Sequence, residues 1–269
     1  MRSIEESERA GIAARITTHL FASARKARVA DVRIGLGYTA VMLADGSVGL
    51  AYTFRHETNS TCTAFDRLRP LVRRPVSDLL ELIGSPDRIE AGIGLAAANS
   101  IGNRDSKKLV NGDVLTQLDI RSDDNVAMVG YFAPLAEAIT KRARALTVFE
   151  RIDQPDGMLR PAHEAQDAMP KCQVVFITAT SIINHTIDGL LTAARGCREV
   201  VVLGASTPLL PEAFERTPVT MLSGVLVKDP QDVMRVISEG GGMRLFSPHV
   251  RKVSLRILST EDQREGLAK

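Results

Sequence analysis

The chain has 269 residues, of which 44% are hydrophobic and 25% charged, the balance of a globular protein with a substantial core. Its formal net charge of +2 is too small to favour nucleic acid or an anionic membrane surface as a partner. With 4% aromatic residues and no Trp, we expect no platform for stacking bases. No long apolar run predicts a transmembrane helix, and the N-terminal stretch MRSIEESERAGIAARI lacks the apolar core of a signal peptide. We therefore expect a cytoplasmic protein.

The first part of the chain predicts a small α+β unit. Apolar residues recur every four positions from Ile12, which predicts an amphipathic helix over residues 3–24. Two β-rich runs follow, joined by Asp45-Gly46, and such a pair favours a hairpin because a type I′ turn needs positive φ at both positions. Two further helices are predicted over residues 77–85 and 86–100.

The second part alternates continuous apolar runs with helical patterns. A polar, turn-rich stretch at 103–113 marks the predicted boundary between a domain 1–110 and a domain 111–269. Strands are expected at 124–130, 145–150, 173–179, 199–204 and 220–227, with helices between them and a last helix in PQDVMRVISEG. This alternation predicts a parallel sheet covered on both faces. The expected fold class is α/β: a Rossmann-like, mostly parallel sheet domain preceded by a smaller α+β domain.

Candidate site residues follow the ends of the expected strands, where open α/β sheets bind ligands. Gly130 and Phe132 form a turn in the position of a nucleotide-binding loop, without the Gly-x-Gly-x-x-Gly pattern. Glu150 closes the next strand, where dinucleotide sites hold a ribose hydroxyl. The alternative is a solvated carboxylate paired with Arg151.

The third strand end is rich in polar side chains. Ser181 can cap the following helix, but capping alone does not require so many hydroxyl and amide groups. We therefore expect a binding role for this group: Thr180, Ser181, Asn184 and Thr186, with His185 among them.

The fourth strand end, Gly204-Ala205-Ser206-Thr207-Pro208, offers backbone amides and two hydroxyls. Such groups suit an oxyanion, so we expect a cradle for a carboxylate or phosphate, with a structural turn as the alternative. Gly224 is a further candidate ligand-binding residue, expected to act mainly through its backbone. From the first domain, Asn99 and Ser100 end a helix of small residues, and Asn99 is expected to reach across a domain contact. The predicted site is a cleft that needs both domains.

The cysteines carry little signal. Cys62, Cys172 and Cys197 stand far apart with no Cys-x-x-Cys pair, so neither a disulfide framework nor a zinc site is expected. We interpret them as buried, inert thiols. His56 and Cys62 are of the type that binds soft metals, but two scattered residues do not make a site.

Several segments, in this order and at these spacings, resemble the "putative heavy-metal chelation" family: VGYFAPLA, VFER, ITATSIINHTIDGLL, VVLGASTPLLPEAF, LSGVLVKDP and SEGGG. The resemblance implies a domain similar to the N-terminal domain of enolase beside a Rossmann-like domain. It also implies a site in the cleft between them and a link to heavy-metal or siderophore metabolism. The chain itself lacks the dense Cys/His/carboxylate cluster that direct soft-metal binding needs.

Three functions follow as hypotheses. The first is binding or processing of a small anionic or metal-chelating ligand in the cleft, with a metal ion or a metal chelate as the expected cofactor. The second is an enzyme with a nucleotide or an S-adenosylmethionine-like cofactor over Gly130 and Glu150, using Glu150, His185 or His56 as acid or base. The third is a structural subunit, which the polar strand ends disfavour. A homo-oligomer is also expected to be favourable, because it would bury an uncovered face of the N-terminal sheet.

Overall fold

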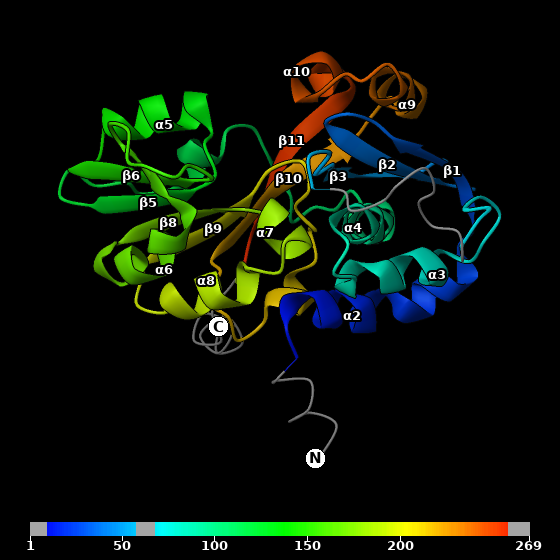
Figure 1. Cartoon of the computed structure of the whole chain (residues 1–269), viewed down its shortest axis with the longest axis horizontal. Helices are drawn as coiled ribbons and strands as arrows, with labels where there is room; N and C mark the ends of the chain where they lie inside the picture. Colours follow the sequence, from blue (N-terminus) through cyan, green and yellow to red (C-terminus); the bar gives the residue numbers. More distant parts are fainter. Residues whose placement is uncertain (1–9, 58–67, 258–269) are drawn as a thin grey trace.

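The computed structural model describes residues 10–57 and 68–257 and shows two packed units (Figure 1). Within these residues no helix has the length and apolar character needed to span a membrane. The N-terminal unit consists of α2 (Ile12–Lys26), β1 (Val29–Ile34), β2 (Tyr38–Leu43), β3 (Val48–Tyr52), α3 (Val76–Leu80), the 3-10 turn η1 (Glu81–Gly84) and α4 (Arg88–Gly102). Residues 3–9 of the first predicted helix lie outside the described residues.

The strands of this unit form an antiparallel sheet in the order β1-β2-β3. The predicted hairpin is confirmed, since β2 pairs with β3 across Asp45-Gly46 and Gly46 has a φ of 84°. The prediction of only two strands is wrong. The first β-rich run folds back on itself between β1 and β2, where the Gly35 amide donates to the Tyr38 carbonyl at 2.9 Å.

The C-terminal unit carries an eight-stranded sheet in the order β4-β11-β10-β9-β8-β5-β6-β7. Its strands are β4 (Val110–Asn111), β5 (Asn125–Val129), β6 (Ala145–Glu150), β7 (Leu159–Pro161), β8 (Val174–Thr178), β9 (Glu199–Leu203), β10 (Met221–Val227) and β11 (Val250–Arg256). Its helices are α5 (Ala133–Thr140), α6 (Ala165–Ala168), α7 (Thr180–Ile183), α8 (Ile187–Ala193), α9 (Pro230–Ser238) and α10 (Met243–Phe246). Its 3-10 turns are η2 (Val114–Gln117), η3 (Ala162–Glu164), η4 (Met169–Lys171), η5 (Pro211–Phe214) and η6 (Ser247–His249).

The strands from β5 to β10 pair in parallel, and β11 runs antiparallel to β10. The predicted fold class is confirmed, and all five expected strands are present. The chain starts its parallel sheet at the central β5, adds β6 and β7 on one side, and then adds β8, β9 and β10 on the other. The strand order therefore reverses between β5 and β8, which is where open α/β sheets form a ligand crevice.

The parallel sheet is buried on both faces, as its apolar runs predict. In β8, Val174 and Phe176 belong to a core cluster with α5, whereas Val175 and Ile177 belong to one with α6 and α8. This alternation follows from the two-residue period of a strand. Of the helices expected between the strands, the one between β9 and β10 is only the short turn η5.

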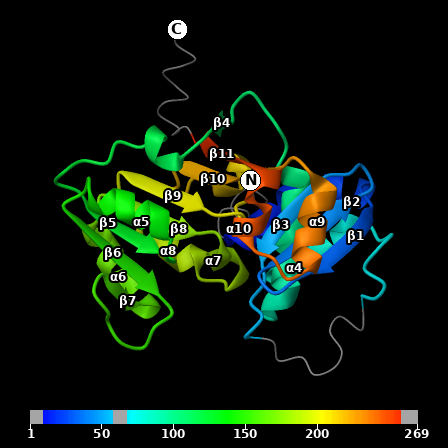
Figure 2. The ribbon, with the colours of Figure 1, turned by 90° about the horizontal axis from the view of Figure 1, so that it is seen from above.

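Helix α9, expected to cover the parallel sheet, covers the N-terminal sheet instead. Figures 1 and 2 show α9 and α10 over β1–β3, on the face opposite α4. Val233, Ile237 and Phe246 pack there against Ala40 and Leu50. The small sheet therefore has both faces covered within one chain, which removes the reason for expecting a homo-oligomer.

An ion pair links the residues that precede β5 and β9, at the edge of the sheet where these strands begin. The Asp124 side chain is 2% exposed and accepts from both terminal nitrogens of Arg198, at 3.0 and 2.6 Å. It also accepts from the Arg121 amide at 2.7 Å. Burial alone would raise the pKa of Asp124, but these hydrogen bonds outweigh it and lower the pKa.

Asp124→Asn is expected to lower the free energy of unfolding by about 1.5–3 kcal/mol at pH 7, the range for hydrogen bonds to a charged group. Because the pKa of Asp124 is lowered in the folded state, its ionised carboxylate stabilises the fold at pH values above the ordinary carboxyl pKa of 3.8. This stabilisation is lost as the pH falls through the folded-state pKa. The difference between the variant and wild type should therefore shrink between pH 7 and about pH 3 in urea denaturation. Asp119→Asn, whose side chain is 71% exposed, is the control and should change stability by less than about 0.5 kcal/mol. An equal loss for Asp124→Asn at both pH values would contradict this role.

Candidate functional site

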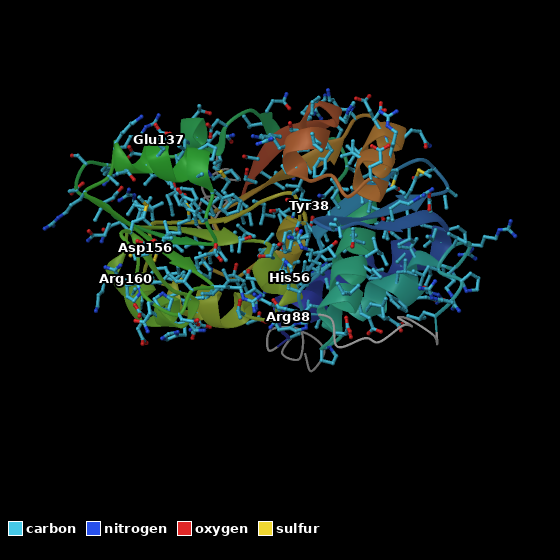
Figure 3. All side chains as sticks on the ribbon, turned by 45° about the horizontal axis from the view of Figure 1, so that its top comes forward. Tyr38, His56, Arg88, Glu137, Asp156 and Arg160 are labelled. Carbon is cyan, nitrogen blue, oxygen red and sulfur yellow. The ribbon has the colours of Figure 1, made fainter. Side chains whose placement is uncertain are left out.

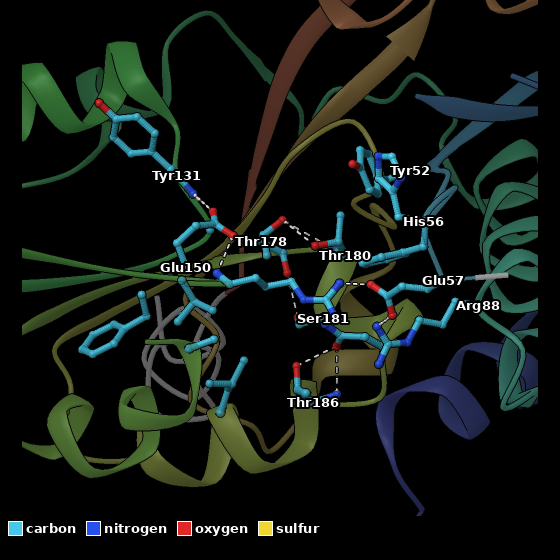
Figure 4. A pocket seen from close by; sticks show the side chains of 18 of the residues that line it. Tyr52, His56, Glu57, Arg88, Tyr131, Glu150, Thr178, Thr180, Ser181 and Thr186 are labelled. Atoms are coloured by element: carbon cyan, nitrogen blue, oxygen red, sulfur yellow. Dashed lines mark hydrogen bonds and ion pairs between the residues drawn. The ribbon is translucent and has the colours of Figure 1, made fainter. Parts of the chain in front are cut away.

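A cleft of about 640 Å³ lies between the two units (Figure 4). One wall comes from β2, β3 and the residues that follow β3. The other comes from the turns after β5, β6 and β8, at the carboxyl ends of the parallel strands. The cleft therefore coincides with the point where the strand order reverses.

Half of the predicted site residues line this cleft. The seven that do are Gly130, Phe132, Glu150, Thr180, Ser181, Asn184 and Thr186. The seven that do not line it are Asn99, Ser100, Gly204, Ser206, Thr207, Pro208 and Gly224. The seven residues that line the cleft lie at the ends of β5, β6 and β8, or in the turns that follow them. Their role in binding a ligand stays a prediction.

The turns after β5 and β6 are joined by a carboxylate. Glu150 accepts from the Tyr131 amide through Oε2 and from the Arg151 amide through Oε1, both at 2.9 Å. Each oxygen has a second lone pair for a further donor. Gly130 has a φ of 87°, and a Cβ there would lie 3.0 Å from the Thr178 side chain, so this turn requires glycine.

The polar side chains after β8 hold one another in place. The hydroxyls of Thr178 and Thr180 are 3.0 Å apart, and Ser181 Oγ donates to the Thr178 carbonyl at 2.7 Å. Asn184 Oδ1 accepts from the hydroxyl of Thr186 at 2.7 Å. These bonds fix the shape of the turn that forms the floor of the cleft.

Two arginines from the two units meet at one carboxylate, and sequence reasoning missed this cluster. Arg88, on α4, and Arg151, just after β6, both form ion pairs with Glu57 (Figure 4). Their guanidinium carbons lie 5.5 and 5.9 Å from the centroid of the Phe54 ring. The alternative was that Arg151 pairs with the Glu150 carboxylate. Instead, the Arg151 guanidinium pairs with Glu57, and the Arg151 backbone amide donates to Glu150. The run of polar residues from Arg55 to Glu57, just after the hairpin, was the one signal of this cluster in the sequence.

The cleft also collects aromatic side chains. Tyr38 and Tyr52 stack edge to face with centroids 5.9 Å apart, and Tyr52 meets Phe54 in the same way at 5.1 Å. Burial, with Tyr52 adding, raises the pKa of Tyr38 to about 12, so its phenol is neutral at physiological pH. In Figure 3, Tyr38, His56 and Arg88 lie near the centre of the view. The other labelled residues, Glu137, Asp156 and Arg160, lie toward the left side of the molecule. In all, six of the eleven aromatic residues line the cleft: Tyr38, Tyr52, Phe54, Tyr131, Phe132 and Phe149.

The histidines do not assemble a metal site. His56 lines the cleft, and its Nε2 accepts from Arg55 Nε at 2.9 Å. His185 has a φ of 59° and its Nε2 lies 2.8 Å from the Ser85 carbonyl, a contact between the two units. Cys62 lies outside the described residues. Within residues 10–57 and 68–257, no group of three or more His, Cys, Asp or Glu could hold a metal ion.

The contacts of the turn after β9 differ from the expected oxyanion cradle. Ser206 and Thr207 are 2% and 0% exposed. Ser206 Oγ accepts from the Tyr52 amide at 2.9 Å, and the Thr207 amide donates to the Gly204 carbonyl at 3.0 Å. Gly204 has the expected positive φ, at 117°. A Cβ on Gly224 would lie 3.2 Å from the Thr207 carbonyl, so the turn is packed from below as well. Ser206 therefore joins the two units, and neither Ser206 nor Thr207 lines the cleft between them.

Asn99 occupies the centre of this contact. Its Nδ2 donates to the Leu50 carbonyl at 2.7 Å and to the Ser206 carbonyl at 3.0 Å. Asn103 adds a second bridge, from its Nδ2 to the Thr207 carbonyl at 3.0 Å. Asn99 does reach across the domain contact, but no ligand fits between it and Ser206 because they touch directly. Ser100 Oγ donates to the Ala97 carbonyl within its own helix.

Comparison with known proteins gives the same description for both units. Residues 18–102 and residues 113–256 each match a family model described as "Putative heavy-metal chelation". An uncharacterized protein of Methanocaldococcus jannaschii is 24% identical over 238 residues, which cover 86% of this chain and 90% of that protein.

Two crystal structures share the fold. A protein with unknown function from Pyrococcus horikoshii has a TM-score of 0.81 at 22% identity, covering 92% of this chain and 100% of the other. A protein with unknown function from Desulfitobacterium hafniense has a TM-score of 0.76 at 23% identity, covering 89% and 98%.

Asn99→Ala is expected to destabilise the whole chain, because it leaves two buried carbonyls without their donor. Each unpaired buried group costs about 1–3 kcal/mol, and urea denaturation measures the sum. Ser100→Ala is the matched control, since it removes only a bond within α4 and should cost about 1 kcal/mol or less. If Asn99→Ala were no more destabilising than Ser100→Ala, the bridge would not hold the units together.

Proposed function

The chain belongs to the family described as "Putative heavy-metal chelation", and we propose that it binds a small organic anion of the metal-chelating kind in the cleft between its two units. The observation that carries the proposal is the convergence of Arg88 and Arg151 on Glu57. One guanidinium comes from each unit, so a ligand there would contact both.

The Glu57 carboxylate lies between two arginines, which indicates that this position would bind an anionic group of a ligand. The Glu57 side chain is 21% exposed, and those of Arg88 and Arg151 are 30% and 56% exposed, so the cations are reachable from the cleft. Guanidinium groups bind carboxylate and phosphate through paired hydrogen bonds. A ligand carboxylate would share or take over the place of Glu57.

The protein side chains of the cleft suit the organic part of a chelate better than a bare metal ion. The described residues offer no group of three or more metal-ligating side chains, so a metal would be held by the ligand's own donor atoms. The wall of Tyr38, Tyr52 and Phe54 would pack against the apolar or flat part of such a ligand.

A nucleotide is the second candidate, and Glu150 favours it. This carboxylate ends β6, the second of the parallel strands along the chain, and adjoins the glycine turn at Gly130, the arrangement in which Rossmann-like domains hold a ribose. The aromatic wall would then face the base. The two candidates share the arginines and differ in whether Glu150 contacts the ligand.

Arg88→Gln and Arg151→Gln are expected to weaken binding of citrate and of AMP by about 10- to 100-fold each. This range follows from about 1.5–3 kcal/mol for a hydrogen bond to a charged group, with 1.4 kcal/mol per tenfold. Calorimetric titration and thermal shift both measure it, since a ligand at 100 times its Kd adds about 2.7 kcal/mol of stability.

Arg121→Gln is the matched control, because it makes the same change of charge at the opposite edge of the sheet, where Arg121 pairs with Asp119. Citrate and AMP affinities that stay at the wild-type level in the Arg88 and Arg151 variants would contradict the proposal. Absence of binding across a panel of carboxylates and phosphates would do so as well.

Glu150→Gln separates the two candidates. If the ligand carries a ribose, the variant should lose most of its affinity for adenosine and AMP and keep its affinity for citrate. Because Glu150 also accepts two backbone amides, we expect a stability loss of about 1 kcal/mol in parallel. Unchanged adenosine binding in a folded variant would exclude the nucleotide candidate.

A further inference from the structure

Two cysteines far apart in the sequence are neighbours at the edge of the sheet opposite the cleft. Strands β8 and β9 pair in parallel from Val174 with Glu199 to Thr178 with Leu203, a constant offset of 25 residues. Cys172 and Cys197 have the same offset, two positions before the first pair. The contact continues toward them, because the Arg198 amide donates to the Gln173 carbonyl at 2.8 Å. The sequence-based view of scattered thiols is therefore wrong for this pair.

The two thiols share one environment. Cys172 Sγ donates to the Ala168 carbonyl at 3.6 Å, and Cys197 Sγ donates to the next carbonyl along the chain, that of Met169, at 3.5 Å. Both side chains are half-buried and pack at the border of the same core cluster. Burial, with repulsion between the two thiolate forms adding, raises the pKa of Cys197 to about 11, so each thiol lies within electrostatic reach of the other.

We propose that Cys172 and Cys197 form a dithiol site for thiophilic metal and metalloid ions that bond to two sulfurs, such as mercury(II) and trivalent arsenic. Mercury(II) replaces two S–H bonds with two sulfur–metal bonds and releases two protons. With an arsenoxide, R–As=O, the two thiols give R–As(S-Cys)2 and one water, without any change of oxidation state. No oxidant or reductant is required.

The proximity of the two thiols determines which reagents react at this site. Each thiol is protonated at neutral pH and hydrogen-bonded to a carbonyl, so it reacts slowly with reagents that need one free thiolate. An ion that bonds both sulfurs forms its second bond within the same molecule, at a high effective concentration. The site therefore favours ions that bridge two thiols over reagents that modify one.

This inference does not rest on the function proposed for the cleft. The cysteines precede β8 and β9, whereas the cleft lies beyond the carboxyl end of β8. Loss of one site leaves the other in place, and the two can be tested separately.

The test uses the full chain carrying Cys62→Ser, so that the third thiol does not contribute. The protein is treated with phenylarsine oxide, washed with excess glutathione and weighed intact by mass spectrometry. The expected result is one arsenical per chain that survives glutathione and is removed by dithiothreitol, because only a two-sulfur adduct resists a monothiol. Absence of an adduct, or its removal by glutathione, would overturn the proposal.

Cys172→Ser and Cys197→Ser, each added to the Cys62→Ser chain, are the controls. A serine hydroxyl can keep the hydrogen bond to the Ala168 or Met169 carbonyl, and circular dichroism verifies that each variant is folded. Each should lose the glutathione-resistant adduct completely. An adduct of wild-type resistance in either single-thiol variant would mean that the sulfurs do not act as a pair.

Discussion

The hydrogen bonds that join strand β3, Asn99 and Ser206 determine how the two units meet. β3 is an edge strand of the small sheet, and an edge strand exposes backbone groups that need partners. The Leu50 carbonyl is satisfied by the Asn99 side chain and the Tyr52 amide by the Ser206 hydroxyl. The polar turn after β9, in the C-terminal unit, thus provides hydrogen-bond partners for the edge strand of the N-terminal sheet.

This arrangement depends on close packing between α4 and β3. A Cβ on Gly49 would lie 2.1 Å from the Ala96 carbonyl and from the Ser100 amide, so only glycine permits the approach. The small residues at the end of α4 bring Asn99 within reach of both β3 and Ser206. The end of β3, and with it Phe54 and Glu57, is thereby held opposite the carboxyl ends of β5, β6 and β8. The cleft is a consequence of the domain contact.

The sequence predicted the parts of this account that depend on local pattern. Continuous apolar runs identified β5, β6, β8, β9 and β10, and the rule for open sheets identified Gly130 and Glu150 at their ends. It misjudged Ser206 and Thr207, because the same small, hydroxyl-bearing turn serves an anion or another backbone equally well. It missed Arg88, Arg151 and Glu57, since nothing local links residues whose meeting is set by tertiary packing. The low aromatic content likewise gave no sign that all three tyrosines line one cleft.

The central claim is that one ligand contacts both units across this cleft. Hydrogen–deuterium exchange tests it most directly, measured without ligand and with citrate or AMP, whichever binds more tightly. The account predicts slower exchange at residues 52–57 of the N-terminal unit together with residues 129–132 and 178–186 of the other unit. Residues 204–208 should show no change, because they do not line the cleft and Ser206 already bonds to Tyr52 in the domain contact. Protection confined to one unit, or centred on residues 204–208, would contradict the account.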